Sequence, residues 1–137
     1  MEKKRNLFAT IMAGLFLLPA AGSLSAEVIC GKEPRLKPVR CVCGKLIDPT
    51  GGPVSAVIVK VLKDGTEVAT MVTAGDGKFI FGELKSGNYE LNAQADGFRM
   101  FRSPIVVAKP AKKCRRGLVI LLDTGGLESC GSRVIKQ

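Results

Sequence analysis

The chain lacks several residue types on which common activities depend. Its 137 residues include no histidine, no tryptophan and a single tyrosine. Histidine is the usual general base near neutral pH and a frequent zinc ligand, so its absence excludes a Ser-His-Asp triad and histidine-based metal chemistry. We therefore expect a non-catalytic protein that needs no metal or other cofactor. A small hydrolase with an unusual site is the weakest alternative.

Aromatic residues are scarce after the first 26 positions. A surface that stacks sugars or nucleic-acid bases needs exposed rings, and the strand pattern described below assigns most of the rings to a core. The run 98–101 is the best candidate for an exposed apolar patch, although core packing is its favoured use. We expect no nucleic-acid partner. The five rings in question are Phe79, Phe81, Tyr89, Phe98 and Phe101.

The N-terminal 26 residues have the pattern of a signal peptide. Lys3, Lys4 and Arg5 precede an apolar run of about fifteen residues, which is short for a membrane span, and small residues follow up to Ala26. Cleavage after Ala26 would leave 111 residues and lower the net charge from +9 to +7. We therefore predict an exported protein, periplasmic or secreted, and a permanent membrane anchor is the alternative.

Residues 73–98 have the strongest secondary-structure signal. Phe79 and Phe81 are spaced by two, and Tyr89 begins a second alternating run. Alternate side chains of a strand point to opposite faces, so each run places one apolar row inward. Gly-containing turns precede and separate the runs. The stretch therefore predicts two adjacent strands, with Leu84 closing the end of the first.

Five further strands are predicted around this unit. They cover residues 41–47, 54–62, 67–72, 100–107 and 114–122, and Asp64-Gly65 is a hairpin signal between the second and third. Pro104 indicates that the sixth strand lies at an edge or contains a bulge. Short strands separated by Gly and Pro turns, without helical periodicity, predict an all-β, seven-stranded Greek-key sandwich. Residues 27–40 then form an extended arm, residues 41–122 the sandwich and residues 123–137 a tail.

The spacing of apolar and glycine residues resembles that of the carboxypeptidase regulatory-like domain, a β-sandwich family related to transthyretin-like (prealbumin-like) and Cna-B-type modules. The resemblance covers roughly residues 41–122, and Ala56 and Ala74 are mild departures from it. The matching patterns are V-x-G-x-L-x-D-x-x-G-x-P-V from Val42, V-x-V-x-V from Val57, and T-x-x-x-G-x-F-x-F-x-x-L-x-x-G-x-Y-x-L-x-A-x-A-x-G-F from Thr73.

This resemblance implies an accessory role and places the last strand beside the first. The histidine-dependent chemistry of transthyretin-like hydrolases is excluded by composition. Cna-B-type domains can form a Lys–Asn isopeptide through an asparagine on the last strand. Here the exported chain contains only Asn88 and Asn92, neither of them in residues 114–122. A self-formed isopeptide is therefore not expected.

All five cysteines follow the predicted cleavage site, and an oxidising compartment favours disulfides between them. The resemblance implies a register that places Val42 and Leu46 in the core, and this register would turn Cys41 and Cys43 outward. We expect two bridges that tie both tails and the last strand to the first strand, although five cysteines allow fifteen such arrangements. The candidates are Cys30, Cys41, Cys43, Cys114 and Cys130.

The odd cysteine leaves two interpretations open, namely a free buried thiol and an intermolecular disulfide to a partner. Zinc bound by thiolates and a redox motif are both disfavoured. No histidine is available as a ligand, and the spacing Cys-x-Cys is not the Cys-x-x-Cys of a redox site. Aspartates 64, 76 and 96 each precede glycine, and turn formation explains them better than calcium binding.

A basic cluster lies between the last two predicted strands. Its functional interpretation is a site for an anionic polysaccharide or a lipid head group, and the alternative is a solvated loop that discourages strand pairing. Taken together, the sequence favours a stand-alone module that binds or braces a protein partner in the cell envelope or outside the cell. Binding of anionic polymers through the cluster is the second hypothesis. The cluster consists of Lys109, Lys112, Lys113, Arg115 and Arg116.

Overall fold

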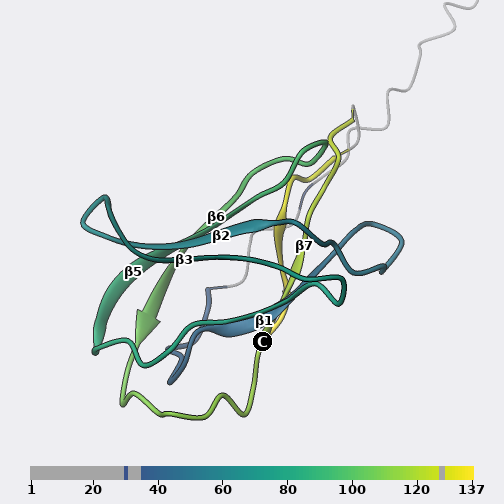
Figure 1. The fold of residues 1–137 in the computed structure, drawn as a ribbon. Coiled ribbons are helices and arrows are strands. Elements are labelled where there is room, and N and C mark those ends of the chain that lie inside the picture. Colours follow the sequence, from purple (N-terminus) through teal and green to yellow (C-terminus); the bar gives the residue numbers. More distant parts are fainter. Residues whose placement is uncertain (1–29, 31–34, 127–128) are drawn as a thin grey trace, which may run out of the picture.

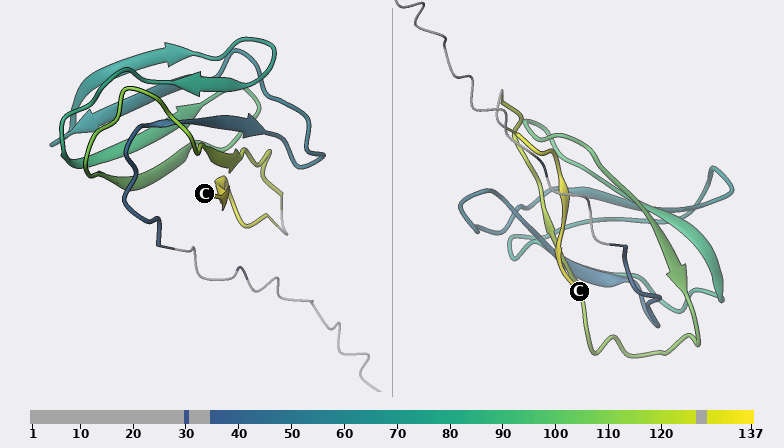
Figure 2. Two further views of the ribbon diagram at one scale, coloured as in Figure 1. Left: turned by 90° about the horizontal axis from the view of Figure 1, so that it is seen from below. Right: turned by 180° about the vertical axis from the view of Figure 1, so that it is seen from behind.

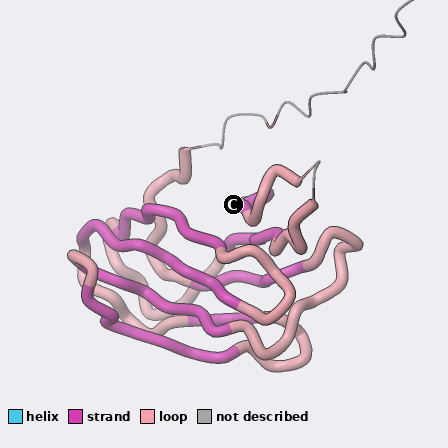
Figure 3. The backbone as a smooth tube through the Cα atoms, turned by 90° about the horizontal axis from the view of Figure 1, so that it is seen from above, coloured by secondary structure: helices cyan, strands magenta, loops and turns pink. Residues whose placement is uncertain are grey.

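The computed structural model describes residue 30, residues 35–126 and residues 129–137. The predicted signal peptide and most of the predicted arm therefore lie outside the described residues. Within the described part every regular element is a strand (Figure 3), and no helix there is long and apolar enough to cross a membrane.

Eight strands form two four-stranded sheets that pack face to face (Figure 1). One sheet has the order β3-β2-β5-β6 and the other has the order β4-β1-β7-β8. The predicted all-β sandwich is thus confirmed. The strands are β1 (Cys43–Ile47), β2 (Ile58–Lys63), β3 (Thr66–Val72), β4 (Lys78–Ile80), β5 (Gly87–Gln94), β6 (Phe101–Val107), β7 (Leu118–Leu121) and β8 (Arg133–Lys136).

The first sheet follows the alternation of the sequence closely. Val59 of β2 pairs with Ala93 of β5, Val61 pairs with Leu91, and all four side chains are completely buried. Full burial of a Val or Leu side chain contributes about 1.5–3 kcal/mol, so this row is a main source of stability. The β2–β3 hairpin turns through Asp64 and Gly65, both at positive φ, as their sequence predicts.

The sixth strand lies at the edge of the first sheet, as Pro104 indicated. β6 pairs with β5 along its length, and a proline is tolerated there because an edge strand can lack one ladder donor. Phe101, in the run proposed as a possible apolar patch, is 1% exposed and belongs to the core, whereas Met100 is exposed. Core packing is therefore the main role of this run.

The second sheet brings the two ends of the domain together. β1 pairs in parallel with β7, so the last predicted strand does lie beside the first. Gly44 makes this approach possible: a Cβ there would collide with the carbonyl oxygen of Leu118 and would lie 2.8 Å from the Phe79 ring. The pattern V-x-G-x-L thus places a glycine between two buried apolar residues, Val42 and Leu46, where a neighbouring strand and a ring leave no room for a side chain.

An eighth strand, beyond the seven predicted from the sequence, lies within the tail. β8 pairs antiparallel with β7 and contributes the buried side chain of Val134 to the core. Figure 2 shows this C-terminal segment folded back beside β7. The strand was missed because it has four residues and a single buried position, which is too short for a period-two signal.

Several predicted strands are shorter in the structure. β1 begins at Cys43, β2 at Ile58 and β7 at Leu118, two to four residues after the predicted starts. Before β2 the backbone bends at Ala56, whose φ is +56°, and it is held by the buried hydroxyl of Thr73. That hydroxyl accepts a hydrogen bond from the amide of Val57 at 3.0 Å and donates one to the carbonyl of Val54 at 3.1 Å. The loop therefore buries apolar residues without a complete ladder.

Candidate functional site: a basic groove around a disulfide

One disulfide joins the segments that lead into β1 and β7. Cys41 and Cys114 are bonded, with their Cα atoms 5.4 Å apart. Because β1 and β7 are parallel neighbours, the residues that precede them lie at the same end of the sheet. The predicted link between the first and last strands is therefore present, with its cysteines just before the strands.

A second disulfide joins Cys30 to Cys130, with the Cα atoms 5.3 Å apart. The prediction that each tail is tied to the first strand is therefore wrong for this bridge, which ties the arm directly to the tail. Lys37 and Gln137 reinforce the link, because the Gln137 side chain accepts from the amide of Lys37 at 2.9 Å and donates to its carbonyl at 2.6 Å. Two residues of the arm, Cys30 and Lys37, are thus linked to the residues on either side of β8.

The fifth cysteine, Cys43, is a free and nearly buried thiol, 9% exposed. Its Sγ lies 3.5 Å from the carbonyl oxygen of Arg116, to which it donates. Burial raises the pKa of the Cys43 thiol, so it is protonated at neutral pH. The odd cysteine was interpreted either as a free buried thiol or as the site of an intermolecular disulfide, and the structure agrees with the buried thiol.

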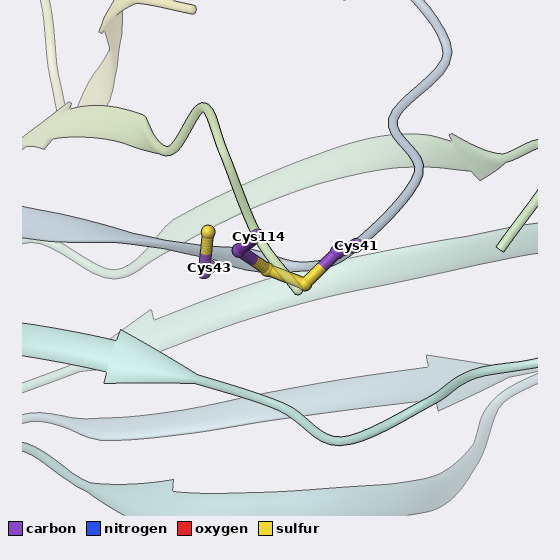
Figure 4. Close-up of side chains that lie close together, drawn as sticks. All are labelled: Cys41, Cys43 and Cys114. Carbon is purple, nitrogen blue, oxygen red and sulfur yellow. A yellow bond between two sulfur atoms is a disulfide. The ribbon is translucent and has the colours of Figure 1, made fainter. Parts of the chain in front are cut away.

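The free thiol lies next to the first disulfide. The sulfur atoms of Cys41, Cys43 and Cys114 are all within 4.8 Å of one another (Figure 4). Two of these sulfurs are bonded to each other, so the cluster offers one thiol. In Figure 4 the Cys114 side chain lies between those of Cys43 and Cys41.

A groove of about 760 Å³ opens on the Cys41 side of this cluster. Three segments form it: the end of the arm, the segment before β7, and the C-terminal residue. Five of its lining side chains are cationic and none is acidic. These cations are Lys37, Arg40, Lys113, Arg115 and Arg116.

The predicted basic cluster is thus divided by the structure. Lys113, Arg115 and Arg116 line the groove, whereas Lys109 and Lys112 are exposed outside it. Lys37 and Arg40 were not part of the prediction. Their position in the sequence, just before Cys41, contained the signal, but only knowledge of the Cys41–Cys114 bridge would have placed them beside the cluster.

Backbone hydrogen bonds hold the arm against the sandwich and fix the groove wall. The amide of Val39 donates to the Val106 carbonyl, and the Val39 carbonyl accepts from Ala108, each at 2.8 Å. The Arg40 guanidinium donates through Nε to the Lys109 carbonyl at 3.0 Å. The groove is therefore preformed, which lowers the entropic cost of binding.

The groove cations have no acidic partner among the described residues. The three salt bridges in that part of the chain use Lys60, Lys78 and Arg102, none of which lines the groove. Five cations around one concave surface, none of them in a salt bridge among the described residues, produce a positive potential that attracts anions. The groove can therefore bind carboxylate or phosphate groups.

A second, more apolar hollow lies on the Cys43 side. Its volume is about 460 Å³, and Met71, Phe79 and Ile80 contribute to its lining. Cys114 lines both hollows, whereas Cys43 lines only this one and Cys41 only the groove. The bridging cysteine thus separates an apolar hollow with a thiol from a basic groove with a disulfide.

Comparison with known proteins agrees with the fold. A search of curated proteins finds no match. Among solved structures the chain is similar to the 5-hydroxyisourate hydrolase of Klebsiella pneumoniae, with a TM-score of 0.54 and 19% identity, over 72% of this chain and 99% of the hydrolase. At that identity the likeness concerns the fold alone.

A family model describes the sequence more directly. The model of the carboxypeptidase regulatory-like domain matches residues 42–115, more than half of the chain. The matched range contains strands β1 to β6. It also contains two of the three clustered cysteines, Cys43 and Cys114. This protein belongs to the carboxypeptidase regulatory-like domain family.

Proposed function

We propose that this chain is a non-catalytic binding module, exported to the cell envelope or outside the cell, which holds an acidic segment of a partner protein in its basic groove. The observation that carries the proposal is the set of five cations, without an acidic residue, that lines a preformed groove. Family membership supports a non-catalytic role, because domains of this type are typically accessory modules.

The lack of histidine argues against a reaction like that of the structural neighbour. With no histidine in the chain, the usual general base is missing. The two disulfides support an exported location, because such bonds persist in oxidising compartments.

A protein ligand is favoured over an anionic polysaccharide by the position of the rings. Phe79, Phe81, Tyr89 and Phe101 are all at most 8% exposed, and the groove is lined by no aromatic residue. Polysaccharide sites usually present rings to the sugar, whereas an acidic peptide needs only guanidinium and ammonium donors. An anionic polymer is the second candidate because the same cations would attract it.

The test is a binding titration with two fluorescent probes, a glutamate-rich peptide and polygalacturonate of comparable length. Arg115→Glu/Arg116→Glu reverses two groove charges. We expect the double variant to bind the peptide about tenfold more weakly, since each lost exposed ion pair costs about 0.2–1 kcal/mol and reversal adds repulsion. Binding of the peptide should also weaken as salt is raised.

The matched control is Lys109→Glu/Lys112→Glu, which makes the same charge change in the same loop outside the groove. We expect it to weaken peptide binding about threefold at most. Equal losses for both double variants would contradict the groove as the binding site. If polygalacturonate bound in the groove and the peptide did not bind, the proposed ligand would be an anionic polymer and not a protein.

A further inference from the structure

The three clustered cysteines meet the geometric requirement for internal thiol–disulfide exchange. In that reaction a thiolate attacks one sulfur of a disulfide and the other sulfur leaves. Cys43 supplies the thiol, and its sulfur lies within 4.8 Å of both sulfurs of the Cys41–Cys114 bond. The reacting sulfur atoms are therefore already close together in the folded domain.

Cys114 is the sulfur better placed for attack. The Cys43 thiol already donates to the carbonyl of Arg116, in the segment that carries Cys114. In Figure 4 the Cys114 side chain is the nearer of the two bonded cysteines to Cys43. Attack on Cys41 would instead close a ring over the single residue Val42. That residue is 1% exposed, and its carbonyl accepts a hydrogen bond from Phe81 at 2.9 Å, so its conformation is fixed by the core.

We propose that Cys43 exchanges with the Cys41–Cys114 disulfide and so delivers a free Cys41 thiolate into the basic groove, where it forms a mixed disulfide with an acidic disulfide ligand. In the first step the Cys43 proton passes to solvent, the Cys43–Cys114 bond forms, and the Cys41 sulfur leaves as a thiolate. No external oxidant or reductant is consumed, because one disulfide and one thiol are present before and after.

In the second step the Cys41 thiolate attacks a disulfide of the ligand. One half of the ligand becomes bonded to Cys41, and the other half leaves as a thiolate. The groove favours both steps, because its cations stabilise the thiolates that form and attract a ligand with carboxylates. The odd cysteine thereby reaches a partner although Cys43 itself is buried.

The charge preference rests on the proposed acidic-ligand function, whereas the exchange does not. The two can therefore fail separately. The exchange is also expected to be slow at neutral pH, since burial keeps the Cys43 thiol protonated. Lys45 and Lys78, which line the same hollow as Cys43, are the charged groups that face it there.

The experiment uses the oxidised full exported chain at mildly alkaline pH. It is incubated with glutathione disulfide, which is anionic, or with cystamine, which is cationic, and is then acidified, digested and mapped by mass spectrometry. We expect the adduct on Cys41, accompanied by a Cys43–Cys114 cross-linked peptide. The adduct should form roughly tenfold faster with glutathione disulfide than with cystamine.

Two variants keep the result interpretable. Cys43→Ser retains the Cys41–Cys114 bridge and should form no Cys41 adduct. Arg115→Glu/Arg116→Glu should reduce the charge preference while leaving the Cys43–Cys114 peptide. An adduct on Cys43 with the original bridge intact would overturn the exchange. Exchange with equal rates for the two probes would overturn the acidic-ligand part alone.

Discussion

The centre of the domain and its two ends are stabilised by different means. In the centre, β2 and β5 pair over five residues, and their inward side chains are completely buried at Val59, Val61, Leu91 and Ala93. At the ends, the strands are short, and disulfides over separations of 73 and 100 residues join segments with little buried surface. The centre is therefore held by apolar burial, and the ends by covalent links.

This difference decides where a function can be placed. Side chains of the central sheet are committed to the core, so substitutions there act on stability. Before β7, the cations and the two bonded cysteines, Cys41 and Cys114, contribute little to the core and are free to serve binding. The basic groove lies before β1 and β7, where the backbone is fixed by the Cys41–Cys114 disulfide and by hydrogen bonds rather than by packed side chains.

The largest expected effect comes from removal of the Cys41–Cys114 bridge. In Cys41→Ser/Cys114→Ser, we expect the free energy of unfolding to fall by about 2–4 kcal/mol, because a long loop in the unfolded chain is no longer closed. Urea unfolding followed by far-UV circular dichroism measures the change.

The comparison variant is Cys30→Ser/Cys130→Ser, whose sequence separation is larger. Loop length alone predicts a similar or larger loss. Cys30 is exposed and Cys130 only half-buried, so without the bridge these ends also gain freedom in the folded chain, and we expect a smaller loss. A larger loss for the Cys30–Cys130 pair would show that this bridge, and not Cys41–Cys114, contributes more to the stability of the domain.

The second prediction concerns Gly44, where the two ends meet the core. Gly44→Ala places a Cβ against the Leu118 carbonyl and the Phe79 ring, so β1 and β7 must separate or the ring must move. We expect a loss of about 1–3 kcal/mol, typical of overpacking in a core. Urea unfolding measures this variant as well.

The control is Gly82→Ala, because a Cβ at Gly82 meets no atom within 4 Å. It should change the free energy of unfolding by less than about 0.5 kcal/mol. If both variants were equally stable, β1 and β7 would approach less closely than the structure has them.

The same contrast explains what the sequence could predict. Residues 73–98 specify their strands locally, since Phe79, Tyr89 and Leu91 each follow a period of two. All three are buried as that period requires. Gly44 was recognised as part of a pattern, but its reason, the neighbouring Leu118 carbonyl, became visible only in three dimensions.

The candidate site was predictable only in part. Lys113, Arg115 and Arg116 form an obvious charge cluster in the sequence. Lys37 and Arg40 join them through contacts about 70 to 100 residues away, and their position just before Cys41 becomes informative only once the Cys41–Cys114 bridge is known. The disulfide connectivity was also not predictable from the sequence, because five cysteines alone do not determine it. The Cys41–Cys114 bond depends on the parallel pairing of β1 with β7.

The smallest expected effect tests the tail through its pH dependence. The backbone amide of Gly125 donates to the Asp123 carboxylate at 2.9 Å. This bond, with the Ser129 side chain and the nearby Arg133 and Arg99, lowers the pKa of Asp123. A lowered pKa in the folded state means that the charged form stabilises the fold at neutral pH. That contribution declines as the pH falls below about 3.9, the ordinary aspartate pKa, and is lost below the folded-state pKa.

At neutral pH we therefore expect Asp123→Asn to melt at a slightly lower temperature than the unmodified chain. The loss in the free energy of unfolding should be below about 1 kcal/mol, because the carboxylate is largely solvated. The difference should narrow as the pH is lowered through the acidic range. Asp64→Asn makes the same charge change in the β2–β3 turn, away from the tail. A pH-independent difference for Asp123→Asn would mean that its carboxylate does not hold the tail, leaving Val134 and the Cys30–Cys130 bridge to fix β8.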